Sequence, residues 1–487
     1  MRDLGGHTGR GLIKTIDWRL VIYYLLLILI GWVNIYASIH SSEPSSIFDW
    51  GCRSGKQFVW ILTSFGLAIL ILFVLSPRVY EGLSVPIYAF VILLLIAVIF
   101  LGIEVKGSRS WFEFGPIRFQ PAEISKISTS LMLATVMSQL GYRIGRMKDF
   151  VITAMIILLP MMIIVLQSET GSALVYVGFI FMLYREGLSG WLIFMIGMAI
   201  LTFILTLTAS PFTAILVLAG IASLCIFLYS GRLKWWLMVC LPLLILMAFV
   251  PSVLSALSDP EVPSFWDKVK PMYLLWGVLA ILIPTAIITA FREGNRFANL
   301  AILSFIAGVV LVYSTDFIFN KVLQDHQRKR IEVLLGMKED PSGVGYNVNQ
   351  AKIAIGSGGF SGKGYLNGTQ TAYGFVPEQS TDFIFCTIGE EWGFLGSTAV
   401  ILLYILLIWR IIKDAEKSRE AFTRIYGYCV ACCLFMHLFI NVGMTLGIMP
   451  VIGIPLPLVS YGGSSMWGFT ALIFIFIALN RNENKYY

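Results

Sequence analysis

Long apolar runs separated by short polar segments fill most of the chain, and their lengths are those of membrane-spanning helices. A helix needs about 17–25 mainly apolar residues to cross a bilayer. Such runs lie near 20–39, 57–75, 85–103, 121–139, 150–166, 190–208, 211–229, 234–250, 272–291, 298–315, 382–409, 424–448 and 465–480, with a shorter run near 172–184. The pattern predicts an all-α, polytopic membrane protein of about fourteen helices.

The longest interruption of this pattern is the segment 316–381, which is rich in charged, amide and turn-forming residues. A loop of this length without clear periodicity is usually functional or disordered. Its aromatic and aliphatic residues argue against plain disorder, because disordered segments are poor in them. We therefore expect 316–381 to contain the working part of the protein.

The composition agrees with a membrane protein. Of 487 residues, 57% are hydrophobic and 13% are charged, and the mean hydropathy is +0.82. Soluble proteins have about 25% charged residues. The net charge of +7 fits the usual excess of Lys and Arg on cytoplasmic loops, so it does not indicate nucleic-acid binding.

The distribution of Lys and Arg predicts the orientation of the chain in the membrane. If the N-terminus is cytoplasmic, the connections on its side contain Arg78, Arg143, Arg146, Lys148, Arg185, Arg232, Lys234, Arg292, Arg296, Arg410, Lys413, Lys417, Arg419 and Arg424. An even number of helices returns the C-terminus to the same side. We therefore expect a protein of the cytoplasmic membrane with both termini in the cytoplasm and the loop 316–381 outside it.

A first group of candidate site residues lies where the connection 104–120 enters the next helix. Its members are Arg109, Trp111, Arg118, Gln120, Glu123 and Lys126. Glu123 and Lys126 are three residues apart and therefore share one face of the helix. Charged side chains in a membrane helix are costly unless they are paired or functional. For Trp111, a role as an interfacial anchor is the favoured alternative.

Further candidates lie in other polar stretches. Glu169 lies in a polar stretch between two apolar runs. A place in a short turn and a role as a functional carboxylate explain its presence there equally well. The basic stretch 324–332, with Gln327 and Arg330, predicts a helix suited to a phosphate or pyrophosphate, which Arg binds bidentately. A solvated helix end, or attraction to anionic lipid headgroups, is the alternative. Asp340 stands in an Asp-Pro turn signature, but beside cations and a Gly-rich backbone its carboxylate can serve as a general base.

Two segments rich in Gly or Pro indicate unusual backbone. The run 354–364 lacks the residue order of a nucleotide P-loop and favours a tight turn with close backbone approach. The segment 450–463 contains three prolines, Ser460 and Tyr461 within an apolar region. Non-helical backbone at membrane depth persists only where protein or a cavity satisfies it. We expect a broken or re-entrant segment that lines a site, with helix-packing glycines as the alternative.

Together these stretches resemble the SEDS family (shape, elongation, division and sporulation). The resemblance is carried by GSRSWFEFGPIRFQPAEISKI, QSETGSAL, HQRKRIEVLL, EDPSGVGYNVNQAKIAIGSGGFSGKGYLNGTQ, FVPEQSTDFIFCTIGEEWGFLG and NVGMTLGIMPVIGIPLPLVSYGGSS. It implies a peptidoglycan glycosyltransferase that polymerises lipid II into β-1,4 glycan strands. Within the family, GTQ and GIPLPLVSYGG are similar to the members that act in cell elongation and rod shape.

The resemblance also implies roles for residues and partners. It assigns the catalytic carboxylate to Asp340 and functional positions to Arg109, Trp111, Glu123, Lys126 and Arg330. Family members usually carry Asp where this chain has Glu169. No cofactor is certain, and Mg²⁺ or Mn²⁺ is the candidate cation. The implied partners are lipid II, a class B penicillin-binding protein that crosslinks the strands, and other proteins of the elongation machinery.

The chain is longer than the family pattern of ten membrane helices. The region 190–315 holds five apolar runs where one is expected. The four additional helices are an even number, so the predicted orientation is unchanged. We predict N-terminal family helices at 1–189, inserted helices at 190–297, and a C-terminal family core at 298–487 that includes the loop.

Two other classes of function stay open from the sequence. The broken segment near 450–463 suits a lipid II flippase or another transporter, although the charged groups gather on one face instead of spanning the membrane midplane. A scaffold that only recruits cell-wall enzymes is the third class. It would tolerate replacement of the charged residues on the outer face.

Overall fold

The computed structural model describes residues 16–40, 46–105, 107–115, 117–229, 234–257, 270–293, 296–323, 325–338 and 343–483. These residues are mainly helical and contain one small antiparallel sheet. Each apolar run predicted from the sequence corresponds to a helix or to consecutive helices, which confirms the all-α, polytopic class. The chain forms two compact units, unit 1 (Met1–Leu188 and Glu339–Tyr487) and unit 2 (Ser189–Lys338).

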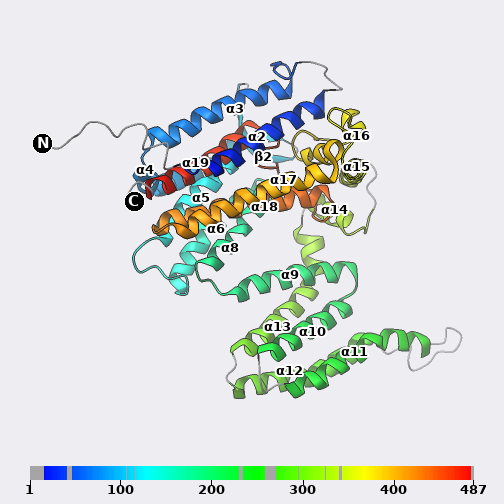
Figure 1. Cartoon of the computed structure of the whole chain (residues 1–487). Coiled ribbons are helices and arrows are strands. Elements are labelled where there is room, and N and C mark those ends of the chain that lie inside the picture. The colour runs from blue at the N-terminus through cyan, green and yellow to red at the C-terminus, as the bar shows by residue number, and fades with distance from the viewer. Residues whose placement is uncertain are drawn as a thin grey trace. The chain divides into compact units, whose positions relative to one another are not determined.

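Unit 1 contains most of the helices (Figure 1). They are α2 (Trp18–Ile39), α3 (Arg53–Ile69) with the π-helix η1 (Leu70–Val74), α4 (Pro77–Leu101), α5 (Pro121–Met137), α6 (Met147–Leu166), α7 (Thr170–Val175), the 3₁₀ turn η2 (Tyr176–Gly178), α8 (Phe179–Arg185), α15 (Val344–Ser357), α16 (Thr369–Ala372), α17 (Ile384–Lys417), α18 (Ala421–Thr445) and α19 (Gly463–Glu483). In the 18-residue apolar stretch of α18 that could cross a membrane, 83% of the residues are buried, against 22% in the corresponding stretch of α17. Helix α18 is therefore the central helix of unit 1, and α17 lies at its surface.

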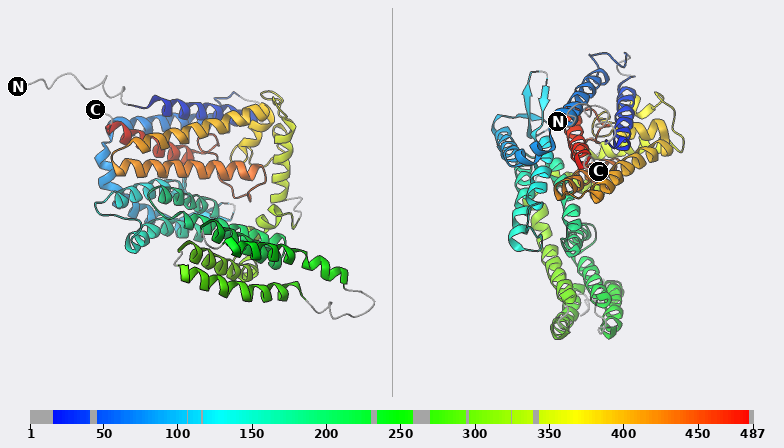
Figure 2. Two further views of the ribbon diagram at one scale, coloured as in Figure 1. Left: turned by 60° about the horizontal axis from the view of Figure 1, so that its bottom comes forward. Right: turned by 60° about the vertical axis from the view of Figure 1, so that its left-hand side comes forward.

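A small sheet joins α4 to α5 and stands at one end of these helices (Figure 2). Its strands β1 (Ile103–Val105), β2 (Ser108–Phe114) and β3 (Ile117–Phe119) pair antiparallel in sequence order. Glu104 stands opposite Arg109, and Glu113 stands opposite Arg118. The prediction of a plain connection at 104–120 missed this sheet, because its strands are too short to give a clear alternating pattern.

The Gly-rich turn after α15 lies directly on the backbone of α17. A side chain on Gly358 would place Cβ 2.0 Å from the carbonyl oxygen of Gly389, and one on Gly362 would place it 2.1 Å from that of Glu391. Helix α17 is kinked at Gly393, whose φ is +63°. Only glycine permits such close backbone approach, so the predicted tight turn at 354–364 is confirmed.

Unit 2 contains the helices that exceed the family pattern. They are α9 (Gly190–Thr208), α10 (Pro211–Tyr229), α11 (Lys234–Leu257), α12 (Pro271–Glu293), α13 (Arg296–Phe317), the π-helix η4 (Ile318–Val322) and α14 (Asp325–Leu334). Their core includes Leu218 of α10, Leu279 of α12 and Phe305 of α13. Unit 2 as a compact body thus includes α13 and α14 besides the predicted insertion. The two units are defined by compactness, whereas the boundaries 189 and 297 were predicted from the family pattern. These boundaries therefore stay predictions.

Among the described residues, 10 helices are long and apolar enough to cross a membrane. The remaining apolar runs form shorter or more polar helices, among them α5, which carries two charged residues in its first two turns. A chain with this many apolar helices is a multi-pass membrane protein.

We predict that Gly362→Ala destabilises unit 1 because φ at this position is +82° and a Cβ would overlap the Glu391 carbonyl. A left-handed backbone and a backbone clash together cost on the order of 2–3 kcal/mol, which lowers the Tm in detergent by about 3–4 °C. Gly356→Ala is the control, since nothing lies within 4 Å of its Cβ. Equal melting temperatures for the two variants would contradict the prediction.

Candidate functional site

A buried ion pair lies in the first two turns of α5. The Nζ atom of Lys126 is 2.9 Å from Oε1 of Glu123, and the two side chains are only 2% and 3% exposed. Residues three apart on a helix face one another, and a charge in an apolar interior is stable only when it is paired. The prediction that these two residues share one face of the helix is confirmed.

His437 of the central helix α18 completes this pair. Its Nε2 lies 2.9 Å from Nζ of Lys126, and its Nδ1 lies 3.2 Å from the carbonyl oxygen of Pro455. A carbonyl can only accept, so Nδ1–H donates to Pro455 and the lone pair of Nε2 accepts from the ammonium. Phe469 covers both groups, with its ring centroid 4.8 Å from Nζ and 4.8 Å from the imidazole. His437 was not predicted from the sequence as a site residue.

Glu169 and Gln120 extend this polar cluster toward the sheet. Gln120, at the N-cap of α5, donates through Nε2 to Oε1 of Glu169, and Ser172 donates to the same oxygen at 2.8 Å. Burial raises the pKa of Glu169, although its hydrogen bonds and the charge of Lys126 act in the opposite direction. Oε2 of Glu169 is itself a buried atom, and the side chain of Ser110 adds a hydrogen bond to this carboxylate. Protein groups therefore hold the carboxylate in place.

The segment between α18 and α19 is non-helical, as predicted, and its residues 454–460 are mostly buried in protein. Asn441 of α18 donates to the carbonyl oxygens of Ile454 at 2.7 Å and Asp382 at 2.8 Å. Tyr404 of α17 donates to the carbonyl oxygen of Pro457. Buried side chains thus satisfy backbone groups that a helix would have satisfied itself.

Ser460 and Tyr461 tie this segment to the residues before α17. The hydroxyl of Ser460 donates to Thr381 O at 2.6 Å and accepts from Leu456 N at 2.8 Å, and Tyr461 N donates to Ser380 O at 2.9 Å. The Ser460 side chain is 4% exposed, so in this structure its hydroxyl fixes the backbone and does not face a ligand. A role of Tyr461 in substrate binding stays a prediction.

The exposed candidates lie on the sheet. Arg109 pairs with Glu104 at 3.6 Å and Arg118 with Glu113 at 3.1 Å, and both arginines are more than half exposed. Opposite charges that face each other across a sheet stabilise it modestly. Trp111, on β2 between them, is half-buried. Of these candidates, only the arginines present charge to the surface.

The remaining predicted residues lie elsewhere. Gln327 and Arg330 are half-buried in α14 of unit 2, which confirms the predicted helix. Their relation to the residues of unit 1 stays a prediction. Asp340 lies outside the described residues.

Sequence reasoning also missed Glu390, which holds the Gly-rich turn in place. Its carboxylate is fully buried and accepts from Lys363 Nζ at 2.7 Å and from the backbone nitrogens of Thr369, Gln370 and Thr371 at 2.8–2.9 Å. The sequence does not reveal these partners, because they lie about twenty residues or more from Glu390 along the chain.

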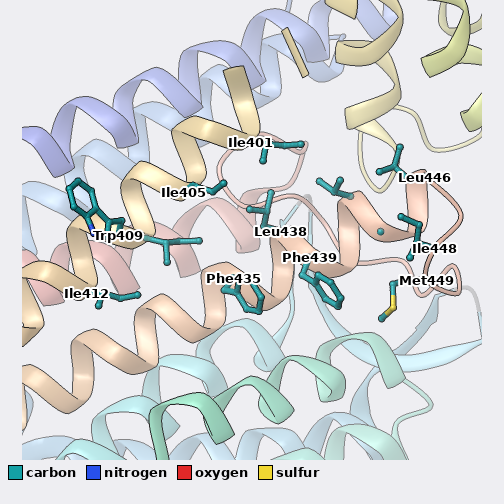
Figure 3. Close-up of a pocket in the computed structure, with 13 residues that line it drawn as sticks. Ile401, Ile405, Trp409, Ile412, Phe435, Leu438, Phe439, Leu446, Ile448 and Met449 are labelled. Carbon is teal, nitrogen blue, oxygen red and sulfur yellow. The ribbon is translucent and has the colours of Figure 1, made fainter. Parts of the chain in front are cut away.

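An apolar groove of about 520 Å³ runs along α17 and α18 (Figure 3). Ile405 and Trp409 of α17 face Phe435 and Phe439 of α18 across it. Its far end is formed by residues 446–449, which begin the non-helical segment. An acyl or prenyl chain suits a groove of this composition.

No group of three His, Cys, Asp or Glu side chains among the described residues is arranged to hold a metal ion. The expected Mg²⁺ or Mn²⁺ stays a prediction.

These features define a multi-pass membrane protein with a buried polar site and an apolar groove beside it. The chain belongs to the cell cycle protein family of FtsW, RodA and SpoVE, whose model matches residues 17–219 and 275–485. This is the SEDS family that the sequence resembles.

Named relatives match most of the chain. It is 32% identical to peptidoglycan glycosyltransferase RodA of Treponema pallidum over 97% of this chain and 99% of that protein. It is 30% identical to peptidoglycan glycosyltransferase MrdB of Escherichia coli over 82% of this chain and 79% of that protein.

Two solved structures share the fold. One, from a peptidoglycan synthase complex that coordinates polymerization and crosslinking, has a TM-score of 0.58 at 24% identity and covers 96% of this chain and 98% of that one. RodA of Thermus thermophilus has a TM-score of 0.50 at 22% identity and covers 96% of this chain and 97% of that one.

We predict that Lys126→Met destabilises the protein strongly because it leaves the Glu123 carboxylate buried without its partner. Removing one member of a buried pair costs about 3–5 kcal/mol, so the Tm in detergent falls by about 4–7 °C. The double variant Glu123→Gln, Lys126→Met recovers most of this loss because no unpaired charge remains. A double variant as unstable as the single one would contradict the prediction.

Proposed function

We propose that this chain polymerises lipid II into β-1,4 glycan strands for cell elongation, with Asp340 as the general base. The chain is a peptidoglycan glycosyltransferase. The observation that carries this conclusion is the match to the Treponema pallidum enzyme over 97% of the chain. The family model agrees with it, since it matches residues 17–219 and 275–485.

The proposed reaction is a single inverting displacement. In the proposed reaction the donor sugar is α-linked to a polyprenyl diphosphate and the product is β-linked. One displacement gives this change of configuration at the anomeric carbon without a covalent enzyme intermediate. Asp340 takes the proton of the acceptor 4-hydroxyl. The oxygen then forms its bond to the anomeric carbon as the bond to the diphosphate breaks, and the electron pair leaves with the polyprenyl diphosphate.

The cations have different parts in this proposal. Arg109 and Arg330 neutralise the departing diphosphate, because guanidinium groups bind phosphate oxygens bidentately. Lys126 was expected to do the same, but its ammonium is buried against Glu123 and His437. We therefore propose that Lys126 supports the structure of the site from its buried position. Trp111, Arg118, Gln120, Glu169, Gln327 and Tyr461 remain proposed substrate-binding residues.

The apolar groove is the proposed site of the prenyl tail. It is open at the surface of α17 and α18 and ends at the non-helical segment, which also contacts the polar site through Pro455. The tail and the diphosphate of lipid II are covalently joined, so their binding sites must adjoin.

The proposed setting is the cytoplasmic membrane, with both termini in the cytoplasm and the loop 316–381 outside, as the Lys and Arg distribution favours. The proposed partner is a class B penicillin-binding protein. The fold shared with a chain of a synthase complex supports this partner. A divalent cation bound by the diphosphate remains a proposal, tested by polymerisation with and without a chelator.

We predict that Asp340→Ala abolishes glycan polymerisation from purified lipid II when the partner is present and its crosslinking is blocked. Loss of a general base lowers the rate by about 10²–10⁴-fold. Asp340→Asn, which keeps the size of the side chain, is expected to be equally inactive. Polymer from both variants would keep the enzyme and exclude Asp340 as its base.

If wild-type protein makes no polymer in this assay, transport of lipid II across protein-loaded vesicles tests the flippase alternative.

We predict that Ile405→Trp raises the KM for lipid II with a full-length prenyl tail by roughly tenfold. Displacing about two CH₂ groups of the tail from the groove costs ~1.6 kcal/mol. Leu402→Trp is the matched control, because this α17 residue is similarly exposed (52% against 49%) but does not line the groove. A lipid II analogue with a short tail should show no difference between the variants. An unchanged KM for the full-length substrate would exclude the groove as the tail site.

A further inference from the structure

His437 forms hydrogen bonds both to the buried ion pair and to the non-helical segment. One ring nitrogen is 2.9 Å from Lys126 Nζ, and the other is 3.2 Å from Pro455 O. The ring is 1% exposed, so it does not touch substrate. Its two contacts come from elements that are 311 and 18 residues away in sequence.

We propose that His437 is a positioning residue for glycosyl transfer, which fixes the Glu123–Lys126 pair relative to the segment 450–462. The proposal rests on the proposed function, because it concerns the rate of that reaction. It assigns a role to a residue that the family resemblance did not mark.

The two ring nitrogens must have opposite roles for this link to exist. Nδ1–H donates to the Pro455 carbonyl, and the lone pair of Nε2 accepts from the Lys126 ammonium. A protonated ring would place a second N–H against the ammonium, so only the neutral Nδ1–H form joins the two elements. The other charged groups that reach this cluster are Glu123 of α5 and Glu169 at the start of α7.

The link reaches the substrate side through two short paths. Lys126 orients Glu123 and acts electrostatically on Glu169, a proposed substrate-binding residue. Pro455 lies directly before Leu456, whose N–H is bound by Ser460, and Ser460 is followed by Tyr461. A shift of about 1 Å in reacting groups can lower a rate by 10²-fold. Loss of the link should therefore lower kcat while leaving KM nearly unchanged.

The test separates the two contacts of the ring. His437→Gln places an amide oxygen near the position of Nε2 and can still accept from Lys126. His437→Asn places an N–H near the position of Nδ1 and can still donate to Pro455, but it is too short to reach Lys126. His437→Leu removes both contacts. Tyr426→Phe is the matched control, since it removes one buried hydrogen bond, to Leu472 O at 3.2 Å, from the same helix.

Because the link needs both contacts, we expect His437→Leu, His437→Gln and His437→Asn each to lower kcat for polymerisation roughly 10–100-fold, with KM within about twofold of wild type. Tyr426→Phe should leave kcat unchanged. Melting temperatures are measured for all four. If kcat falls only in proportion to the loss of folded protein, or if either variant that keeps a single contact has the kcat of wild type, the ring does not act as a link and the proposal is overturned.

A second measurement does not depend on activity. Nitrogen-15 NMR of the imidazole, assigned by its loss in His437→Gln, should show a protonated Nδ1 and an unprotonated Nε2 whose shift changes in Lys126→Met. Any other tautomer in the wild type overturns the proposal even when polymer is made. Absence of polymer from a wild type with the expected tautomer instead counts against the proposed function.

Discussion

Enclosure of a non-helical backbone inside a helical bundle is the constraint on which the rest of unit 1 depends. The segment between α18 and α19 has no helix to satisfy its carbonyl groups, and an unsatisfied group at membrane depth costs several kcal/mol. Asn441, Tyr404 and His437 donate to carbonyl groups of the segment, and the hydroxyl of Ser460 accepts from the N–H of Leu456. Three of these belong to α17 or α18, which explains why the central helix carries polar residues at buried positions.

The same constraint explains how α5 can carry an ion pair in a buried position. A Glu–Lys pair alone leaves N–H groups of the ammonium unpaired, and desolvating them is costly. His437 accepts one of them while its other nitrogen serves the segment. The stability of the fold and the geometry of the site therefore depend on one set of contacts, so substitutions here are expected to affect stability and activity together.

The sequence predicted what depends on local pattern and missed what depends on distant contacts. Apolar runs located the helices because lipid imposes a length and a composition on each one. The Glu123–Lys126 pair was predictable because helical spacing brings the two residues together. His437 was missed because its partner Lys126 lies 311 residues away. Glu390 was missed because nothing in GEEW shows which backbone would fold over it. Asp340 was assigned by resemblance, and local pattern alone favoured a turn.

The substrate class explains why polar and apolar sites share one structural element. A lipid-linked sugar joins a prenyl tail to a diphosphate through a single bond, so a protein that acts on it must place an apolar surface beside a charged one. Residues 446–449 close the groove, and residues 455–461 bind His437 and Thr381. A helix across this distance would expose side chains of one character on each face. A broken segment with three prolines can instead change direction between the lipid and the polar cluster, and the buried hydrogen bonds of α17 and α18 offset its cost.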